Sequence, residues 1–291
     1  MNGSKVDAPR RNSSGLARDV ELLELLGGAE AVRAGGLGVL RIAQLTGRDK
    51  AVVSRALATL CDAGLIDRNE DMTYRLGARL YSLAARTAYS TLVAQAQPLL
   101  RQVAQFTRET THLCVLRGGN VLTILSELSP HEFRTTGWEG VTTAAWRTPS
   151  GRVLLSDWSD EALSRWYAEH GADRAVVGPL DPGMAIAGFS VLESPPADKV
   201  VVRDLDSLRA EIRRIRERGY ALLDEELELG VVGASAPVTD FTGRIIAAVN
   251  ISAPKARVGG RLDSLGAYVA RAAAQLSAQI GGSARTPAQP R

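Results

Sequence analysis

The sequence of 291 residues has few of the side chains that build disulfide frameworks and metal sites. Its two cysteines, Cys61 and Cys114, are far apart and predict neither a disulfide framework nor a zinc site, which fits a reducing compartment. The three histidines, at positions 112, 131 and 170, lack the spacing of metal ligands. We therefore expect no metal and no other cofactor.

Long hydrophobic runs are also missing. No apolar run approaches the roughly 18 residues that a membrane span needs, and the longest stretches, such as 245–249, fit buried strands. The first residues, Met-Asn-Gly-Ser-Lys, are not followed by an apolar segment, so we expect no secretory signal. The predicted location is the cytoplasm, and no membrane partner is expected.

The overall composition is that of a globular protein. Hydrophobic residues make up 45% and charged residues 23% of the chain, which excludes a mainly disordered protein. The length favours two domains, at roughly 150 residues each. The net charge of +3 permits a nucleic-acid partner without demanding one. Basic residues gather in 47–61 and in 204–218; the second group surrounds an apolar helical stripe and predicts a solvated helix face.

The first quarter of the chain has helical patterns separated by glycines. Apolar residues between positions 20 and 26 predict a helix, and five glycines in 27–38 predict a loop. Apolar residues recur at helical spacing in 39–45 and again in 52–60. Asp49 precedes the second of these helices, where its carboxylate can accept hydrogen bonds from free amides of the first turn.

A hairpin pattern follows the second helix. Residues 65–68 and 73–76 predict two short strands around a polar turn. Helix, tight turn, helix and hairpin in this order are typical of a winged helix-turn-helix. We therefore predict a winged helix-turn-helix DNA-binding domain over 16–77, preceded by a disordered tail over 1–15.

The remainder of the chain reads as α+β. Residues 78–95 predict a linker and dimerisation helix with an apolar face that includes Leu80 and Leu83, and Pro98 is expected to begin a second helix. Alternating patterns over 112–116 and 121–125 predict a hairpin. Further helices are expected over 149–170, 205–218 and 262–280, a loop over 171–200, and strands over 221–223, 231–238 and 245–252. This second domain would span 96–281, followed by a disordered tail over 282–291.

Several motifs resemble those of the IclR family of bacterial transcription regulators. They lie at 40–47, 54–57, 63–66, 74–77, 215–221, 224–230, 236–238 and 243–252, within a resemblance that covers about 16–281. The resemblance implies an N-terminal winged helix, a dimerising linker helix and a C-terminal effector domain related to the GAF/profilin-like fold. It also implies that the protein binds its operator as a homodimer or as a homotetramer that is a dimer of dimers. A response to small metabolites, often carboxylic or aromatic acids, is implied as well.

The second helix of the predicted helix-turn-helix carries the candidate DNA contacts. Its first turns would enter the major groove, where arginine can donate two hydrogen bonds to guanine. The residues placed for bases or phosphates are Arg48, Lys50, Ala51, Ser54 and Arg55, with Arg68 placed for the backbone. The alternative is a protein-binding winged helix whose charges are merely solvated.

The candidate effector site combines a possible helix start, paired strands and tryptophans. We predict that its residues are Trp138, Trp146, Pro149, Ser150, Gly151, Leu223, Val231, Gly233, Asn250 and Ser252. Free amides near Ser150 and Gly151 would attract an anion, and Asn250 and Ser252 point to the same side of one strand. The alternatives are ordinary packing for the tryptophans and a local backbone hydrogen bond for Asn250.

Departures from the family pattern indicate the kind of effector. Gly233 stands where a cysteine is common, Leu223 where an acid is common and Trp146 where a histidine is common. Each difference removes a polar side chain or adds apolar surface. We therefore expect a larger, partly apolar effector, such as an aromatic acid or its derivative.

An enzyme needs a reactive constellation, and the sequence shows none. His112 and Cys114 share a strand face without a third group, so Cys114 is expected to be a small core residue. Ser150 is not in a nucleophile elbow. Glutamates 225, 226 and 228 are expected to face solvent or to cap local structure. The predicted function is an effector-responsive transcription regulator, a repressor; the alternative is a ligand-binding or protein-interaction module that does not bind DNA.

Overall fold

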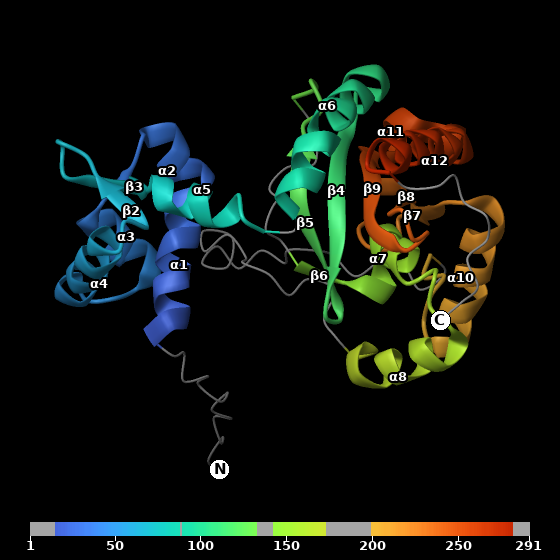
Figure 1. Ribbon diagram of the computed structural model, residues 1–291, viewed down its shortest axis with the longest axis horizontal. Helices are drawn as coiled ribbons and strands as arrows, with labels where there is room; N and C mark the ends of the chain where they lie inside the picture. The colour runs from blue at the N-terminus through green and yellow to red at the C-terminus, as the bar shows by residue number, and fades with distance from the viewer. Residues whose placement is uncertain (1–14, 88, 133–141, 173–198, 282–291) are drawn as a thin grey trace, which may run out of the picture. The chain divides into compact units, whose positions relative to one another are not determined.

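A computed structural model describes residues 15–87, 89–132, 142–172 and 199–281 (Figure 1). These residues form two compact units, one before and one after position 88. Trp138, most of the expected loop 171–200 and both predicted tails lie outside the described residues, apart from Gly15, which begins the first helix.

The first unit is a winged helix-turn-helix, as the sequence predicts. Its elements are α1 (Gly15–Gly27), α2 (Ala29–Ala34), β1 (Leu37–Gly38), α3 (Val39–Thr46), α4 (Lys50–Asp62), β2 (Ile66–Arg68), β3 (Thr73–Leu76) and α5 (Ala78–Ala84). The three strands form an antiparallel sheet in the order β1-β3-β2. The prediction of a loop over 27–38 is wrong in part, because this stretch contains α2 and β1. The glycines at 28 and 35 flank α2 as its caps, and most of its residues are the good helix formers alanine, glutamate and arginine.

Local chemistry explains how α3 and α4 are separated. Gly47 ends α3 with a φ of 63°, a left-handed conformation that favours glycine. The carboxylate of Asp49 then accepts a hydrogen bond from the amide of Ala51 at 2.8 Å, which confirms it as the cap of α4. After α4, Gly64 has a φ of 68° and turns the chain into β2. The core beneath these helices includes Leu22, Ile42 and other fully buried apolar residues: Val53, Leu57 and Ile66.

The second unit is built on a six-stranded antiparallel sheet in the order β6-β5-β4-β9-β8-β7. Its strands are β4 (Thr110–Arg117), β5 (Asn120–Glu127), β6 (Thr142–Ala144), β7 (Ala221–Asp224), β8 (Val231–Thr239) and β9 (Ile245–Pro254). Its helices are α6 (Tyr89–Thr107), α7 (Pro149–Leu154), α8 (Asp160–His170), α10 (Leu205–Arg218), α11 (Lys255–Val258) and α12 (Leu262–Gln279), with short 3-10 turns at Ala145–Arg147 and Gly259–Arg261. The α+β class is confirmed.

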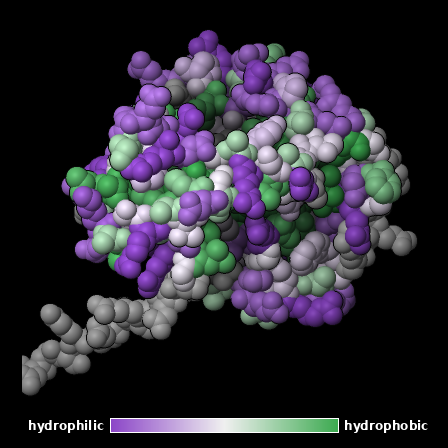
Figure 2. All heavy atoms as spheres, turned by 60° about the vertical axis from the view of Figure 1, so that its left-hand side comes forward, coloured by the Kyte–Doolittle hydropathy of each residue, from purple (hydrophilic) through white to green (hydrophobic). Residues whose placement is uncertain are grey.

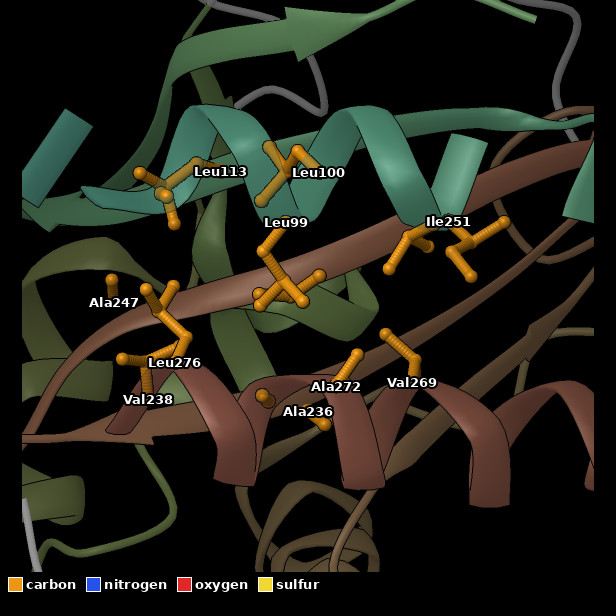
Figure 3. Close-up of a cluster of buried hydrophobic side chains, with 14 of the residues drawn as sticks. Leu99, Leu100, Leu113, Ala236, Val238, Ala247, Ile251, Val269, Ala272 and Leu276 are labelled. Atoms are coloured by element: carbon orange, nitrogen blue, oxygen red, sulfur yellow. The ribbon is translucent and has the colours of Figure 1, made fainter. Parts of the chain in front are cut away.

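The two faces of this sheet have different partners. One face packs against α6 and α12, whose Leu99, Leu100, Val269 and Leu276 meet residues such as Ile251 (Figure 3). Alternate residues of the same strands point to the opposite face, where α7, α8 and α10 lie. His112 on β4 and both Asn250 and Ser252 on β9 are among these alternate residues, so their side chains face α7.

Three expected helices differ from the structure. The linker over 78–95 is not one helix, because α5 ends at Ala84 and α6 begins at Tyr89. Pro98 lies inside α6 and does not begin a helix. The helix expected over 149–170 is divided into α7 and α8, and the side chain of Ser159 caps α8 by accepting from the amide of Ala162 at 3.2 Å.

The basic helix α10 is only partly solvated. Arg213 and Arg214 are exposed, as expected. In contrast, the guanidinium of Arg216 donates to the carbonyl oxygens of Ser156 and Trp158, and Arg218 forms an ion pair of 2.7 Å with Glu211. Arg216 thus holds α10 against the segment that follows α7, whereas the pair of Arg218 with the buried Glu211 lies within α10 itself.

The surface mixes polar and apolar side chains. Figure 2 shows small groups of hydrophobic atoms between hydrophilic ones over the visible face. Among the described residues, no helix combines the length and hydropathy that a membrane crossing requires.

Candidate DNA-binding surface and effector cavity

The helix α4 presents a polar face outside the core of the first unit. Val53, Leu57 and Leu60 point inward at helical spacing. Lys50, Ala51, Ser54 and Arg55, which the sequence places at the DNA, are all exposed. The amino-terminal half of α4 can therefore approach a major groove without disturbing the core. The role of these four residues in DNA binding stays a prediction.

Arg48 is engaged within the protein rather than free. It lies in the turn before α4, and its guanidinium contacts the carboxylate of Glu21 and donates to the carbonyl oxygen of Arg18 at 3.1 Å. Its side chain is 19% exposed. This pairing fastens the start of α4 to α1, so Arg48 orients the helix in this conformation.

The wing is held by its own side chains. Asn69 donates hydrogen bonds of 2.9 Å to the carbonyl oxygen of Gly35 and to the hydroxyl of Thr73. Arg68, the predicted backbone contact, is exposed, and its guanidinium carbon lies 5.7 Å from the centre of the Tyr74 ring. The ring limits the positions of the guanidinium while leaving its donors accessible.

The helix α5 leaves apolar side chains exposed. Tyr81 is 80% exposed and Leu83 is 50% exposed, while Leu80 is half-buried. No residue of α5 is buried in the described chain. An apolar helix face of this kind is the feature that the predicted dimerisation would cover.

A cavity of about 70 Å³ lies between the sheet of the second unit, α7 and the turn that joins β7 to β8. Seven of the predicted effector residues line it: Pro149, Ser150, Leu223, Val231, Gly233, Asn250 and Ser252. The register explains their convergence, since Gly233 on β8 is the partner of Ser252 on β9. The remaining described lining is His112, Cys114, Val121, Thr123, Thr143, Thr148, Leu227, Glu228 and Val232.

The polar end of the cavity is centred on Asn250. Its amide nitrogen donates to the hydroxyl oxygen of Ser252 at 3.0 Å, and its Oδ1 is buried without a hydrogen-bond partner in the described chain. The side chain therefore does not make the local backbone hydrogen bond that was its alternative role. On the neighbouring strand, Nδ1 of His112 lies 2.9 Å from the hydroxyl of Ser126.

Burial shapes the chemistry of two lining residues that sequence reasoning did not place here. It lowers the pKa of His112 to about 4, so the imidazole is neutral near neutral pH. Burial also raises the pKa of the Cys114 thiol, which keeps it protonated and unreactive. Cys114 is buried, as expected of a core residue, and it lines the cavity as well.

The start of α7 is not an open anion site. The hydroxyl of Thr148 caps it by accepting from the amide of Gly151 at 3.1 Å. Gly151 does not line the cavity; it lets α7 approach Ala145, whose backbone a side chain at this position would overlap. Ser150 does line the cavity, and its hydroxyl accepts from Ser235 at 3.3 Å. The expectation that Gly151 offers its amide to a ligand is therefore wrong in this structure.

Trp146 does not form a wall of the cavity. It is 5% exposed and packs edge-on against Tyr167, with ring centres 5.9 Å apart, and Arg147 stacks on it at 4.2 Å. Ordinary packing, the alternative considered for the tryptophans, describes Trp146.

Gly233 gives the cavity less room than its lack of a side chain suggests. A Cβ at this position would lie 3.3 Å from the carbonyl oxygen of Ile251 and 3.7 Å from Pro149. The ring of Pro149 therefore occupies part of the space that a side chain would take. The cavity is smaller than the roughly 150 Å³ known to hold benzene, so an aromatic ring would require its lining to move.

Of the glutamates after β7, Glu225 caps local structure, one of its two expected roles, because its carboxylate accepts from the amide of Gly230 at 3.1 Å, whereas Glu226 is buried and does not face solvent. Glu226 forms a buried ion pair with Arg152, and Glu225 lies 2.6 Å from the ammonium of Lys255. The Lys255 ammonium holds the pKa of Glu225 at about 2, well below its usual range. These contacts fix the start of the turn that carries Leu227 and Glu228 to the cavity. Pairs so far apart in the sequence leave no local signal.

The part of the chain that the structure describes contains no group of three or more residues able to hold a metal ion. The arrangement thus has two parts: a winged helix with an exposed polar helix face, and a domain with a mostly uncharged cavity. These features define a ligand-binding protein with a helix-turn-helix head.

Comparison with known proteins identifies the family. Residues 85–177 and 194–278 match the family model described as the bacterial transcriptional regulator IclR C-terminal domain. The chain is 29% identical over 266 residues to the HTH-type transcriptional regulator BhcR of Paracoccus denitrificans, covering 90% of this chain and 85% of that protein. It is 24% identical to the transcriptional repressor IclR of Escherichia coli, with 92% and 90% covered.

A solved structure shows the same fold. It is an IclR homologue of Microbacterium hydrocarbonoxydans complexed with 4-hydroxybenzoate, with a TM-score of 0.65, 21% identity and coverage of 92% of this chain and 99% of that chain.

The chain belongs to the IclR family of transcription regulators. It is a DNA-binding transcriptional regulator with an effector-binding C-terminal domain. Members of this family are regulators and not enzymes, which confirms the expectation from the sequence.

Proposed function

We propose that the protein is a repressor that binds a specific operator and that a small molecule in the cavity modulates this binding. The observation that carries the proposal is that one chain has both an exposed face on α4 and a separate domain with a cavity. Seven of the residues predicted for the effector site line this cavity. Operator DNA is the partner that accounts for Lys50 and Arg55 on α4, and this partner places the protein in the cytoplasm.

The contacts to DNA are assigned by position. Lys50, Ala51, Ser54 and Arg55 approach base edges or phosphates from α4, and Arg68 contacts the backbone from the wing. Arg48 joins them only if a phosphate replaces the carboxylate of Glu21, since that carboxylate occupies its guanidinium.

The oligomer is proposed from α5. A single winged helix covers a short site, and proteins of this kind gain affinity by binding two half-sites as a dimer. Leu80 and Leu83 lie on a helix without a buried residue in the described chain, so a second copy would bury them. A dimer of dimers is the next assembly that this arrangement permits.

We propose an aromatic acid or a derivative of one as the effector. Val121, Leu223, Leu227 and Val231 supply apolar walls, and Asn250 lies among hydroxyl groups at the polar end. The homologue with 4-hydroxybenzoate has the same fold. Because the ligand-free cavity is about 70 Å³, a ring requires outward movement of the turn between β7 and β8.

A gel shift with the DNA upstream of the protein's own gene tests this function. We expect a saturable complex that unlabelled upstream DNA displaces and a scrambled fragment of equal length does not. Equal competition by the two fragments would favour the alternative, a ligand-binding or protein-interaction module that does not read DNA.

A further inference from the structure

The cavity is nearly free of positive charge. Among the described residues that line it there is no lysine or arginine, and Glu228 contributes a carboxylate. His112 lines the cavity too, but burial lowers its pKa to about 4 and leaves the ring neutral near neutral pH. An ionised carboxylate placed here would have no counter-charge in direct contact.

The cations around the cavity are already paired. The guanidinium of Arg152 makes two hydrogen bonds to Glu226, at 3.2 and 2.7 Å. The ammonium of Lys255 lies 2.8 Å from Asp224 and 2.6 Å from Glu225, and Lys199 lies 3.3 Å from Glu225. Three cations thus share three carboxylates. Turning Arg152 toward a ligand would break a buried pair, and turning either lysine would break a pair that is partly exposed.

The start of α7 offers fewer donors than a free helix end. The amide of Gly151 donates to Thr148, and the hydroxyls that line the cavity are weaker ligands for a full negative charge than a cation. A carboxylate moved from water into such a site loses hydration that a few hydroxyls do not replace. The cavity therefore disfavours an acid in its ionised form.

Asn250 favours a ligand that donates a hydrogen bond. Its side chain is 7% exposed, and its Oδ1 has no hydrogen-bond partner in the described chain. This oxygen lies 3.8 Å from the position that a Cβ would take on Gly233, so no side chain at position 233 covers it. A buried acceptor without a partner is unfavourable, and a ligand that donates a hydrogen bond to it would remove this penalty.

We infer that the cavity selects an uncharged ligand that donates a hydrogen bond to Oδ1 of Asn250, such as a primary amide, over a carboxylate of the same shape. This inference rests on the proposed effector site and narrows the effector to a neutral derivative. Asn250 is the specificity-determining residue, because its nitrogen donates to Ser252 and its oxygen is left for the ligand.

Two matched pairs of probes test the inference on the full chain. Benzamide and benzoate have nearly the same shape, as do propionamide and propionate, so each pair differs in charge and donor capacity alone. Saturation-transfer NMR is sensitive enough to detect weak binding of any of the four probes. Competition titrations then give the ratio of the two dissociation constants within each pair. We expect the amide to bind at least about tenfold more tightly than its carboxylate in the pair that fits, since hydrogen bonding and charge burial act together.

Two variants test whether Asn250 causes the preference for the amide. In Asn250→Leu the ratio should fall to about twofold or less, because the unpaired acceptor is gone. Ser277→Ala removes a buried hydroxyl of α12, away from the cavity, and should keep the wild-type ratio. Circular dichroism verifies that both variants fold.

Three other results would contradict the inference. Tighter binding of either carboxylate, an amide preference that persists in Asn250→Leu, or no binding of any probe would overturn the inference. A gel shift run beside the titrations separates this from the proposed function. If amides bind through Asn250 but operator affinity is unchanged, the inference stands and the proposed coupling to DNA fails.

Discussion

Arg152 and Glu226 form a two-point ion pair inside the effector domain, although they are 74 positions apart in the chain. Their side chains are 2% and 5% exposed. The guanidinium also donates to the carbonyl oxygen of Trp146 at 3.0 Å. The pair connects α7, which carries Pro149 and Ser150, to the turn that covers the cavity.

Removal of one partner of this pair should destabilise the second unit. Glu226→Ala leaves a buried guanidinium without its counter-charge, and we expect the free energy of unfolding to fall by about 3–5 kcal/mol. Urea denaturation followed by circular dichroism measures the loss. Replacing both partners by apolar residues, as Arg152→Met with Glu226→Leu, should recover much of it.

The control is an ion pair of similar geometry at the surface. Arg41 and Glu30 lie 2.7 Å apart, and both side chains are 48% exposed. Solvent screens such a pair, so Glu30→Ala should have a much smaller effect. If Glu226→Ala proved no more harmful than Glu30→Ala, the buried pair would not have the structural role assigned to it.

The exposed face of α4 should set the affinity for DNA. Arg55→Ala or Lys50→Ala should weaken operator binding by about 1–3 kcal/mol if the contact is to a base, or flatten the salt dependence by about one unit if it is to a phosphate. Fluorescence anisotropy over a range of salt concentrations distinguishes the two cases. Arg117→Ala removes the same charge from the exposed hairpin end of the other unit and should change neither quantity. Unchanged affinity and slope in both α4 variants would remove this helix from the interface.

The apolar face of α5 should hold the dimer together. Leu80→Glu combined with Leu83→Glu places charges where a second copy would bury leucines, so we expect monomers and loss of tight operator binding. Light scattering and a gel shift measure the two effects. Wild-type protein that is already monomeric at micromolar concentration would contradict this assignment.

His112 should make the protein sensitive to mild acid. Its pKa is about 4 in the folded protein, below its ordinary value of 6.5, because burial disfavours the charged ring. The unfolded chain therefore binds the proton more tightly, and the stability is fully present above about pH 6.5 and falls as the pH approaches 4.

Urea denaturation at several pH values measures this loss, which His112→Gln should reduce. Proton NMR of the ring gives an independent result: titration of His112 near its ordinary pKa would show that the imidazole is not buried as described.

Much of the fold follows from local sequence signals. Asp49 and Gly64 bound α4 as predicted, since capping and left-handed turns depend on a few adjacent residues. The parity of Asn250 and Ser252 placed both on one face of β9, because side chains alternate strictly along a strand.

The remainder depends on long-range packing. The division of the linker between α5 and α6 was not visible, because the apolar pattern continues through both helices. Trp146 packs against Tyr167, and Arg152 forms an ion pair with Glu226. Both contacts join residues far apart in the sequence, so no local pattern predicts them. The strand face that His112 shares with Cys114 follows from the sequence, but the cavity that both residues line depends on packing against α7.

A DNase I footprint on the DNA upstream of the protein's own gene tests the central claim most directly. The account predicts a protected site with two related half-sites, centred about one helical turn or a multiple of it apart, because a dimer presents two copies of α4. Arg55→Ala should abolish the protection at the same protein concentration. Absence of any protected site at concentrations where the wild-type protein is dimeric would contradict sequence-specific operator binding.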